Sequence, residues 1–133
     1  HHCLNEGEVD DAEAALNWLC LQQPDLPVTL LGFSFGGYVA ASLALRLSAR
    51  SEDLHHLMMV APAVNRLPEQ LQFDPQMRLS VIQPELDEVI SAKQVYAWSA
   101  GLERDHELLK VAECGHFFHG KLVELKELVQ PRL

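Results

Sequence analysis

The sequence has few cysteines, few basic residues and no long apolar run. Its 133 residues include three cysteines, Cys3, Cys20 and Cys114, and no two of them have CxxC spacing. This pattern argues against a disulfide framework or a thiolate zinc site, and it favours a reducing, cytoplasmic compartment. The longest apolar stretches, such as residues 28–33 and 57–64, are far shorter than the roughly 20 residues that a membrane-spanning helix needs.

Basic residues are also outnumbered, because 10 lysines and arginines face 19 aspartates and glutamates, for a net charge of −9 with histidine neutral. Phosphate backbones and anionic lipids repel such a chain, so we expect neither a nucleic acid nor a membrane among its partners. The apolar share of 48% is typical of a globular protein, and the length suits one domain. We therefore expect a single domain over residues 1–133.

Helical and strand patterns alternate along the whole chain. Short, nearly continuous apolar runs such as residues 28–33 are typical of strands that are buried on both faces of a parallel sheet. The order of elements predicts an α/β fold with three layers, α/β/α, around a mostly parallel sheet. The expected helices cover residues 9–19, 36–50, 91–102 and 122–129, the expected strands cover residues 28–33, 57–60, 79–82 and 107–112, and residues 65–76 read as a loop.

The strongest local signal is Gly32-Phe33-Ser34-Phe35-Gly36, which matches G-x-S-x-G between a strand and a helix. A strand that turns directly into a helix forces the corner residue into a strained backbone conformation. We expect Gly32 and Gly36 to approach each other so closely that both must lack a Cβ atom. The Ser34 hydroxyl would then stand clear of the chain, and the N–H of Phe35 would point to a developing oxyanion.

Two other interpretations of this turn stay open at this point. A glycine-rich turn also suits a purely structural role, in which it packs a helix closely against a sheet. Phosphate binding is a weaker interpretation, because the turn lacks both a Gly-Lys-Ser/Thr ending and Gly-x-Gly-x-x-Gly spacing.

A catalytic serine needs a base, and the base needs an orienting acid, on loops that share its edge of the sheet. The third expected strand is followed by Glu85, Asp87 and Glu88. Asp87 is favoured because a short side chain is easier to hold rigidly. Glu85 is the substitute, and a solvated acidic loop is the non-catalytic alternative. The fourth expected strand is followed by His116, which lies between a glycine and two aromatic residues.

The other histidines suggest no second site. His116 and His119 together resemble part of a metal site, but no third ligand stands at a suitable spacing, so we expect no metal and no organic cofactor. The remaining histidines are expected at the surface or at strand ends: His1, His2, His55, His56 and His106.

Ser34, Asp87 and His116 follow one another along the chain, each at the carboxyl end of an expected strand. In this order, and in the segments 30–37, 86–90 and 114–118, the sequence resembles the C-terminal portion of the α/β-hydrolase superfamily. It is most similar to small bacterial serine hydrolases related to dienelactone hydrolases and short-chain esterases. The resemblance implies that Ser34 is the nucleophile, Asp87 the acid and His116 the base, with the N–H of Phe35 as one oxyanion donor.

Two features depart from that family. Pro84 stands where the family often has a glycine before its acid. The family fold also begins with several strands that have no counterpart here, including the strand whose following loop supplies a second oxyanion donor. We therefore expect an α/β-hydrolase fold that lacks its N-terminal strands. The strand at residues 28–33 would then have an open edge, which is a docking surface or a site of self-association.

The resulting functional hypothesis is a serine hydrolase. It would cleave an ester, a thioester or a related acyl bond of a small-molecule substrate through a Ser-His-Asp triad and an acyl-enzyme. The alternatives are a catalytically silent, truncated module and an acyltransferase or peptidase, because fold does not fix function. Four apolar residues of the loop at 65–76 and its edge would either face an acyl group or cover the sheet: Leu67, Leu71, Phe73 and Met77.

Overall fold

Four parallel strands form the sheet, in the spatial order β1-β2-β3-β4. The computed structural model describes residues 7–11, 13–16, 27–67 and 71–133. Consecutive strands are in register, so that Leu31 pairs with Met58 and Ile82 pairs with Leu109. The strands are β1 (Thr29–Phe33), β2 (His56–Val60), β3 (Arg78–Pro84) and β4 (Glu107–Val111).

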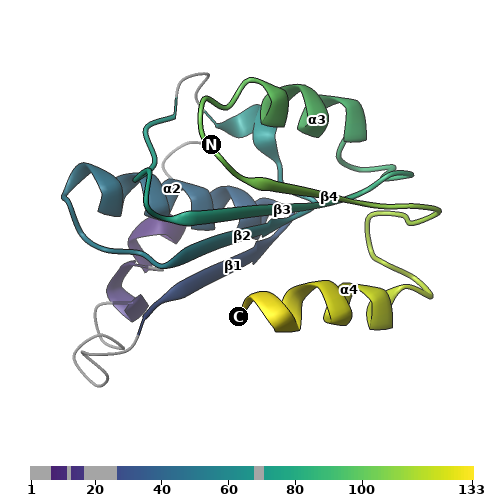
Figure 1. Ribbon diagram of the computed structural model, residues 1–133, viewed down its shortest axis with the longest axis horizontal. Coiled ribbons are helices and arrows are strands. Elements are labelled where there is room, and N and C mark those ends of the chain that lie inside the picture. Colours follow the sequence, from purple (N-terminus) through teal and green to yellow (C-terminus); the bar gives the residue numbers. More distant parts are fainter. Residues whose placement is uncertain (1–6, 12, 17–26, 68–70) are drawn as a thin grey trace.

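Helices cover both faces of this sheet, which confirms the three-layer α/β/α expectation. Helices α2 (Phe35–Ala49) and α3 (Ala92–Ala100) lie on one face, and α4 (Leu122–Val129) lies on the other (Figure 1). Residues 7–11 and 13–16 are also helical and pack with α2 through Val9 and Leu16. The rest of the helix expected at residues 9–19 lies outside the described residues.

Each face has its own apolar core, because alternate residues of a strand point to opposite sides. Leu57 of β2 packs with α2 and α3, whereas its neighbour Met58 packs with α4. Both side chains are fully buried, as a central strand of a parallel sheet requires. These two cores hold the carboxyl ends of the strands in place, and the loops that leave those ends carry the candidate site.

Strand β1 differs from the expectation that both of its faces are buried. Leu31 is 50% exposed and Phe33 is 42% exposed. Helix α2 packs against β1, but the core around α4 contains no residue of β1. Among the described residues, β1 pairs with β2 alone, so its second edge is open. In the part of the chain that the structure describes, one edge of this strand is therefore unpaired, and the face that carries Leu31 and Phe33 is only partly covered.

The region between β2 and β3 belongs to the core. A short 3-10 turn covers Val64–Arg66. Leu67, Phe73 and Met77 are buried among the residues of the α2 core, and Leu71 packs against it. These side chains therefore cover the sheet, which is the second of the two alternatives that the sequence left open.

The elements after β2 depart from the expected bounds only at their ends. Strand β3 continues to Pro84, and α3 ends at Ala100, two residues before Leu102. The Oγ of Ser91 accepts a hydrogen bond from the N–H of Gln94 and so caps α3. None of the described helices combines the length and the apolar character needed to cross a membrane.

Candidate active site

Ser34 occupies the sharp turn between β1 and α2. Its backbone has φ 56° and ψ −117°, a combination that costs about 1–3 kcal/mol in a residue with a side chain. Neighbouring backbone groups hold it there. The N–H of Ser34 donates to the carbonyl of Val60 at 2.8 Å, and its carbonyl accepts from the N–H of Gly37 at 3.0 Å. The strained corner that the G-x-S-x-G pattern predicted is present.

The glycines of this turn have unequal roles. A Cβ atom on Gly32 would overlap the carbonyl oxygen of Gly36 and would lie 2.7 Å from the nitrogen of Gly37. A Cβ atom on Gly36 would meet nothing within 4 Å, so the expectation that Gly36 must lack one is wrong. The close approach is one-sided, because the backbone of Gly36 faces Gly32 while its own Cβ direction points into open space. Gly37 is more crowded than Gly36, though less crowded than Gly32, since a Cβ atom there would lie 3.1 Å from Cβ of Pro62.

The N–H of Phe35 is free to bind an anion. Phe35 is the first residue of α2, so this N–H has no partner within the helix. In the part of the chain that the structure describes, it donates no hydrogen bond to any other group. A free N–H at the positive end of a helix, next to the Ser34 side chain, is a suitable donor for an oxyanion.

Asp87 and His116 form a buried pair. The Oδ2 atom of Asp87 lies 2.9 Å from Nδ1 of His116, and the two side chains are 0% and 2% exposed. The other carboxylate oxygen accepts from the N–H groups of Val89 and Ile90 at 2.8 and 2.7 Å. Because an ionised carboxylate only accepts, Nδ1 carries the proton in the neutral imidazole, and Nε2 is left as an acceptor. The structure pairs His116 with Asp87 and not with Glu85.

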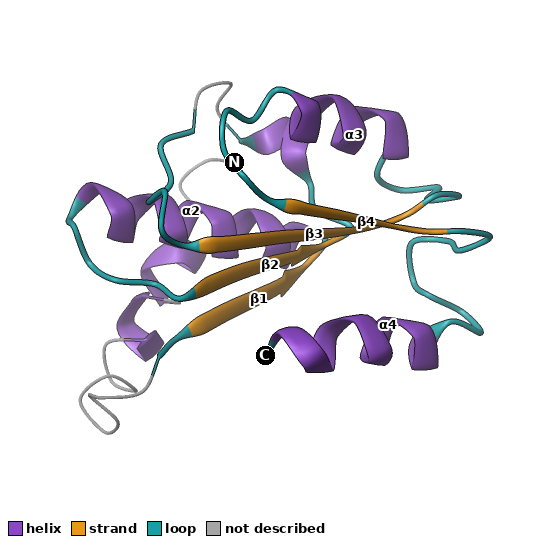
Figure 2. Cartoon of the chain, viewed as in Figure 1, coloured by secondary structure: helices purple, strands orange, loops and turns teal. Residues whose placement is uncertain are grey.

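The loops that carry Ser34, Asp87 and His116 leave the same end of the sheet (Figure 2). The ring of Phe33, one residue before Ser34, lies 5.0 Å from the ring of His116. No hydrogen bond joins Ser34 to His116 in the described residues. Such bonds are often long in an enzyme without substrate and tighten in the reacting complex. The geometry thus joins Asp87 to His116 and places the His116 ring against the residue that precedes Ser34.

Gln83 supports the Asp87 carboxylate, and the sequence pattern did not single it out. Its Nε2 atom donates to Oδ2 of Asp87 at 3.1 Å, and its side chain is completely buried at the end of β3. The available signal was a polar amide that directly follows the expected buried strand at residues 79–82. A buried polar side chain costs free energy unless it makes a hydrogen bond, which makes such a residue a candidate for a specific contact.

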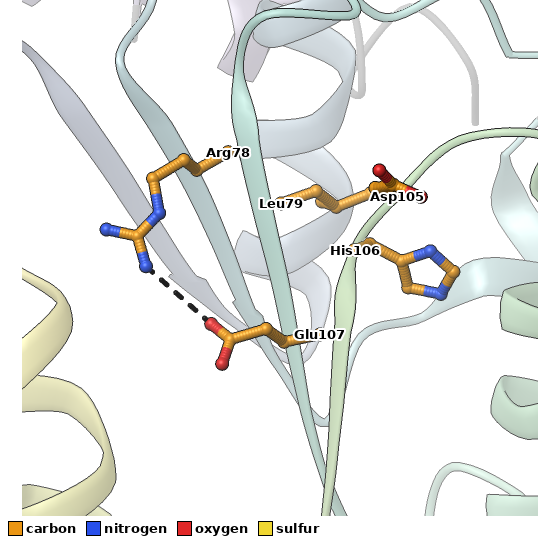
Figure 3. Close-up of a pocket in the computed structure, with 5 residues that line it drawn as sticks. All are labelled: Arg78, Leu79, Asp105, His106 and Glu107. Carbon is orange, nitrogen blue, oxygen red and sulfur yellow. Dashed lines mark ion pairs between the residues drawn. The ribbon is translucent and has the colours of Figure 1, made fainter.

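A second polar cluster lies at the opposite end of the strands. A cavity of about 250 Å³ is lined by Arg78, Leu79, Asp105, His106 and Glu107, and Figure 3 shows Arg78 pointing toward Glu107. The guanidinium of Arg132 holds the pKa of Glu107 below its ordinary value. This cavity is at the amino ends of β3 and β4, and none of the predicted catalytic residues lines it.

His56 belongs to the same cluster. It is the first residue of β2, which agrees with its expected place at a strand end, and its side chain is fully buried. Its Nδ1 and Nε2 atoms lie 3.0 Å from the carbonyl oxygen of Arg132 and 2.8 Å from Oγ of Ser80. Burial lowers the pKa of His56. The His56 ring therefore joins the short 3-10 turn at Gln130–Arg132 to the sheet.

Comparisons with known proteins agree with this architecture. An α/β serine hydrolase homologue from Coxiella burnetii is 31% identical with a TM-score of 0.84, over 97% of this chain and 60% of that protein. A lidless α/β serine hydrolase from Xanthomonas campestris is 34% identical with a TM-score of 0.80, over 95% and 55% of the two chains. An uncharacterised protein of Rickettsia prowazekii is 28% identical over 96% of this chain and 56% of its own length.

The chain therefore spans somewhat more than half the length of the proteins that it resembles. The thioesterase domain family matches residues 12–110, a segment that contains Ser34 and Asp87 and ends before His116. That segment is most of the chain. Together with the parallel sheet and the serine turn, the match identifies this chain as a member of the thioesterase domain family, with the α/β-hydrolase fold.

Proposed function

We propose that the chain carries the catalytic machinery of a serine hydrolase that cleaves an ester or thioester of a small molecule. The observation that carries the proposal is the buried pair of Asp87 and His116, which lies at the same sheet edge as the strained turn of Ser34. Membership of the thioesterase domain family supports acyl chemistry. The thioester is therefore tested alongside the oxygen ester.

The proposed reaction proceeds in two halves. Oγ of Ser34 attacks the acyl carbon while Nε2 of His116 takes the hydroxyl proton. The carbonyl electron pair moves onto oxygen, and the N–H of Phe35 donates to that oxyanion. When the intermediate collapses, the bond to the leaving group breaks, and His116 returns its proton to that group. Water then repeats the sequence on the acyl-Ser34 ester and releases the acid.

Asp87 has an electrostatic role in this scheme. Its carboxylate fixes the tautomer with the proton on Nδ1, and it stabilises the imidazolium that forms when His116 accepts the proton. The hydrogen bonds from Val89, Ile90 and Gln83 hold the carboxylate in one orientation. This preorganisation lets the pair act without first rearranging.

The direct test is turnover of p-nitrophenyl acetate and of a short-chain acyl thioester. We expect Ser34→Ala and Asp87→Asn to lower kcat by about 10³-fold or more, with little change in stability. Ser51→Ala is the matched control, because Ser51 is a second serine with a positive φ of 56° that is exposed and follows the end of α2 opposite to Ser34. We expect this control to keep full activity.

Two outcomes would reject the proposal. One is turnover by Ser34→Ala at the wild-type rate. The other is a folded chain with no turnover in any polypeptide that contains it, which would favour a catalytically silent module. An acyltransferase would instead reveal itself by product analysis, because an added alcohol or amine would compete with water for the acyl group.

A further inference from the structure

Three consecutive residues of the loop after β3 contact the loop that carries His116. The N–H of Leu86 donates to the carbonyl of Cys114 at 2.9 Å, and Asp87 accepts from the imidazole. The third contact is made by Glu88, whose Oε1 atom accepts from the backbone N–H of His116 at 3.1 Å. Glu88 is thus the side chain in this loop that touches the main chain of His116 itself.

Gly115 provides the room for this contact. A Cβ atom at position 115 would lie 2.8 Å from Oε2 and 3.5 Å from Oε1 of Glu88. Both distances are to the end of a flexible side chain, so a methyl group there would displace the carboxylate and leave the backbone in place. The absence of a side chain at Gly115 therefore leaves the space that the Glu88 carboxylate occupies.

The loop around His116 needs an external support. Glu113 and Phe118, which flank it, both have positive φ values of 53° and 56°. Such conformations are unfavourable for residues with side chains and persist only when surrounding contacts fix them. The bond from Asp87 to Nδ1 orients the ring but leaves the position of the His116 backbone to other contacts. The Glu88 carboxylate supplies one such contact.

We propose that Glu88 is a positioning residue of the hydrolase: its carboxylate binds the His116 N–H and thereby sets the distance from the imidazole to Ser34. The inference rests on the proposed function, since the distance matters only if His116 acts on Ser34. A displacement of about 1 Å is enough to cost 100-fold in rate. Asp87 therefore sets the orientation of the base, and Glu88 sets its position.

Four variants test the proposal in the p-nitrophenyl acetate assay. Glu88→Ala removes the acceptor, and we expect kcat to fall about 10- to 100-fold with KM and thermal stability nearly unchanged. Glu88→Gln keeps an oxygen acceptor of the same reach, so we expect it to retain most of the activity. Gly115→Ala should lower kcat as Glu88→Ala does, and the double variant Gly115→Ala/Glu88→Ala should be no worse than either single change. Glu85→Ala, with the same charge change in the same loop, should match the wild type.

The opposite results would overturn the proposal. Wild-type kcat in Glu88→Ala would do so, and so would equal losses in Glu88→Ala and Glu88→Gln. A loss of kcat that merely follows a loss of thermal stability would reduce Glu88 to a structural support. Additive losses in the double variant would show that Gly115 acts independently of the carboxylate.

Hydrogen exchange separates this inference from the proposed function, because it requires no catalysis. The N–H of His116 should exchange about 10-fold or more faster in Glu88→Ala than in the wild type or in Glu85→Ala, because its acceptor is gone. Unchanged exchange would overturn the contact even in an active enzyme. If exchange changes as expected while Ser34→Ala remains active, the contact stands and the proposed function falls.

Discussion

The pair of variants Gly32→Ala and Gly36→Ala tests the geometry of the serine turn. The two changes add the same methyl group four residues apart. At Gly32 the added carbon would meet the backbone of Gly36 and Gly37, at 2.5 Å from the carbonyl carbon of the one and 2.7 Å from the nitrogen of the other. At Gly36 it would meet no atom within 4 Å.

The backbone contacts fix the expected magnitude. Overpacking costs about 1–3 kcal/mol, and Gly32 belongs at the upper end because relief requires the first turn of α2 to move as a whole. A loss of about 3 kcal/mol corresponds to a fall in Tm of about 10 °C for a domain of this size. Gly36→Ala should leave Tm unchanged or raise it, since alanine is favoured over glycine in a helix by up to about 1 kcal/mol.

Thermal unfolding followed by circular dichroism provides the assay, with urea unfolding as the second measure of stability. In the same preparations, Gly32→Ala should lose the proposed esterase activity, because the shift of α2 would move the N–H of Phe35 away from the substrate oxyanion that forms when Ser34 attacks. Equal stability of the two variants would refute the one-sided close approach that the structure describes.

Three further predictions concern other parts of the molecule. Burial lowers the pKa of His56, so the unfolded chain binds more protons than the folded chain. The free energy of unfolding should therefore fall as the pH drops below about 6.5, and His56→Gln should flatten this dependence in urea titrations; an unchanged slope would contradict it. Burial also raises the pKa of the Cys114 thiol, so iodoacetamide should label it only after denaturation. Leu31 on the open β1 predicts self-association at high concentration, which Leu31→Lys should weaken in analytical ultracentrifugation; a wild-type chain that stays monomeric would exclude it.

Local patterns in the sequence were sufficient to predict the layers, the parallel strands and the serine turn. The strained corner at Ser34 follows from a strand that runs directly into a helix. Gly32 is required there because a Cβ atom would overlap the backbone of Gly36. Asp87 and His116 could be selected because the carboxyl ends of parallel strands meet at one edge. The hydrogen bond between Asp87 and His116 depends on the rotamers of both side chains, and the sequence does not specify these rotamers.

Other features depended on contacts that the sequence does not encode locally. Phe33 belongs to an apolar run, yet it is partly exposed because the core around α4 does not extend to β1 in the described residues. His56 is buried because Ser80 and Arg132, far away along the chain, bind its two ring nitrogens. Position 36 has room for a Cβ atom because the backbone there directs the Cα–Cβ bond into open space, which the sequence pattern does not show.

The central claim is that Ser34, His116 and Asp87 act as one hydrolytic unit. A fluorophosphonate probe followed by peptide mass spectrometry tests it most directly. We expect one adduct on Ser34 in the wild-type protein, a much slower reaction in His116→Gln and Asp87→Asn, and none in Ser34→Ala. Labelling that survives in Ser34→Ala, or that proceeds at the wild-type rate in His116→Gln, would contradict the account.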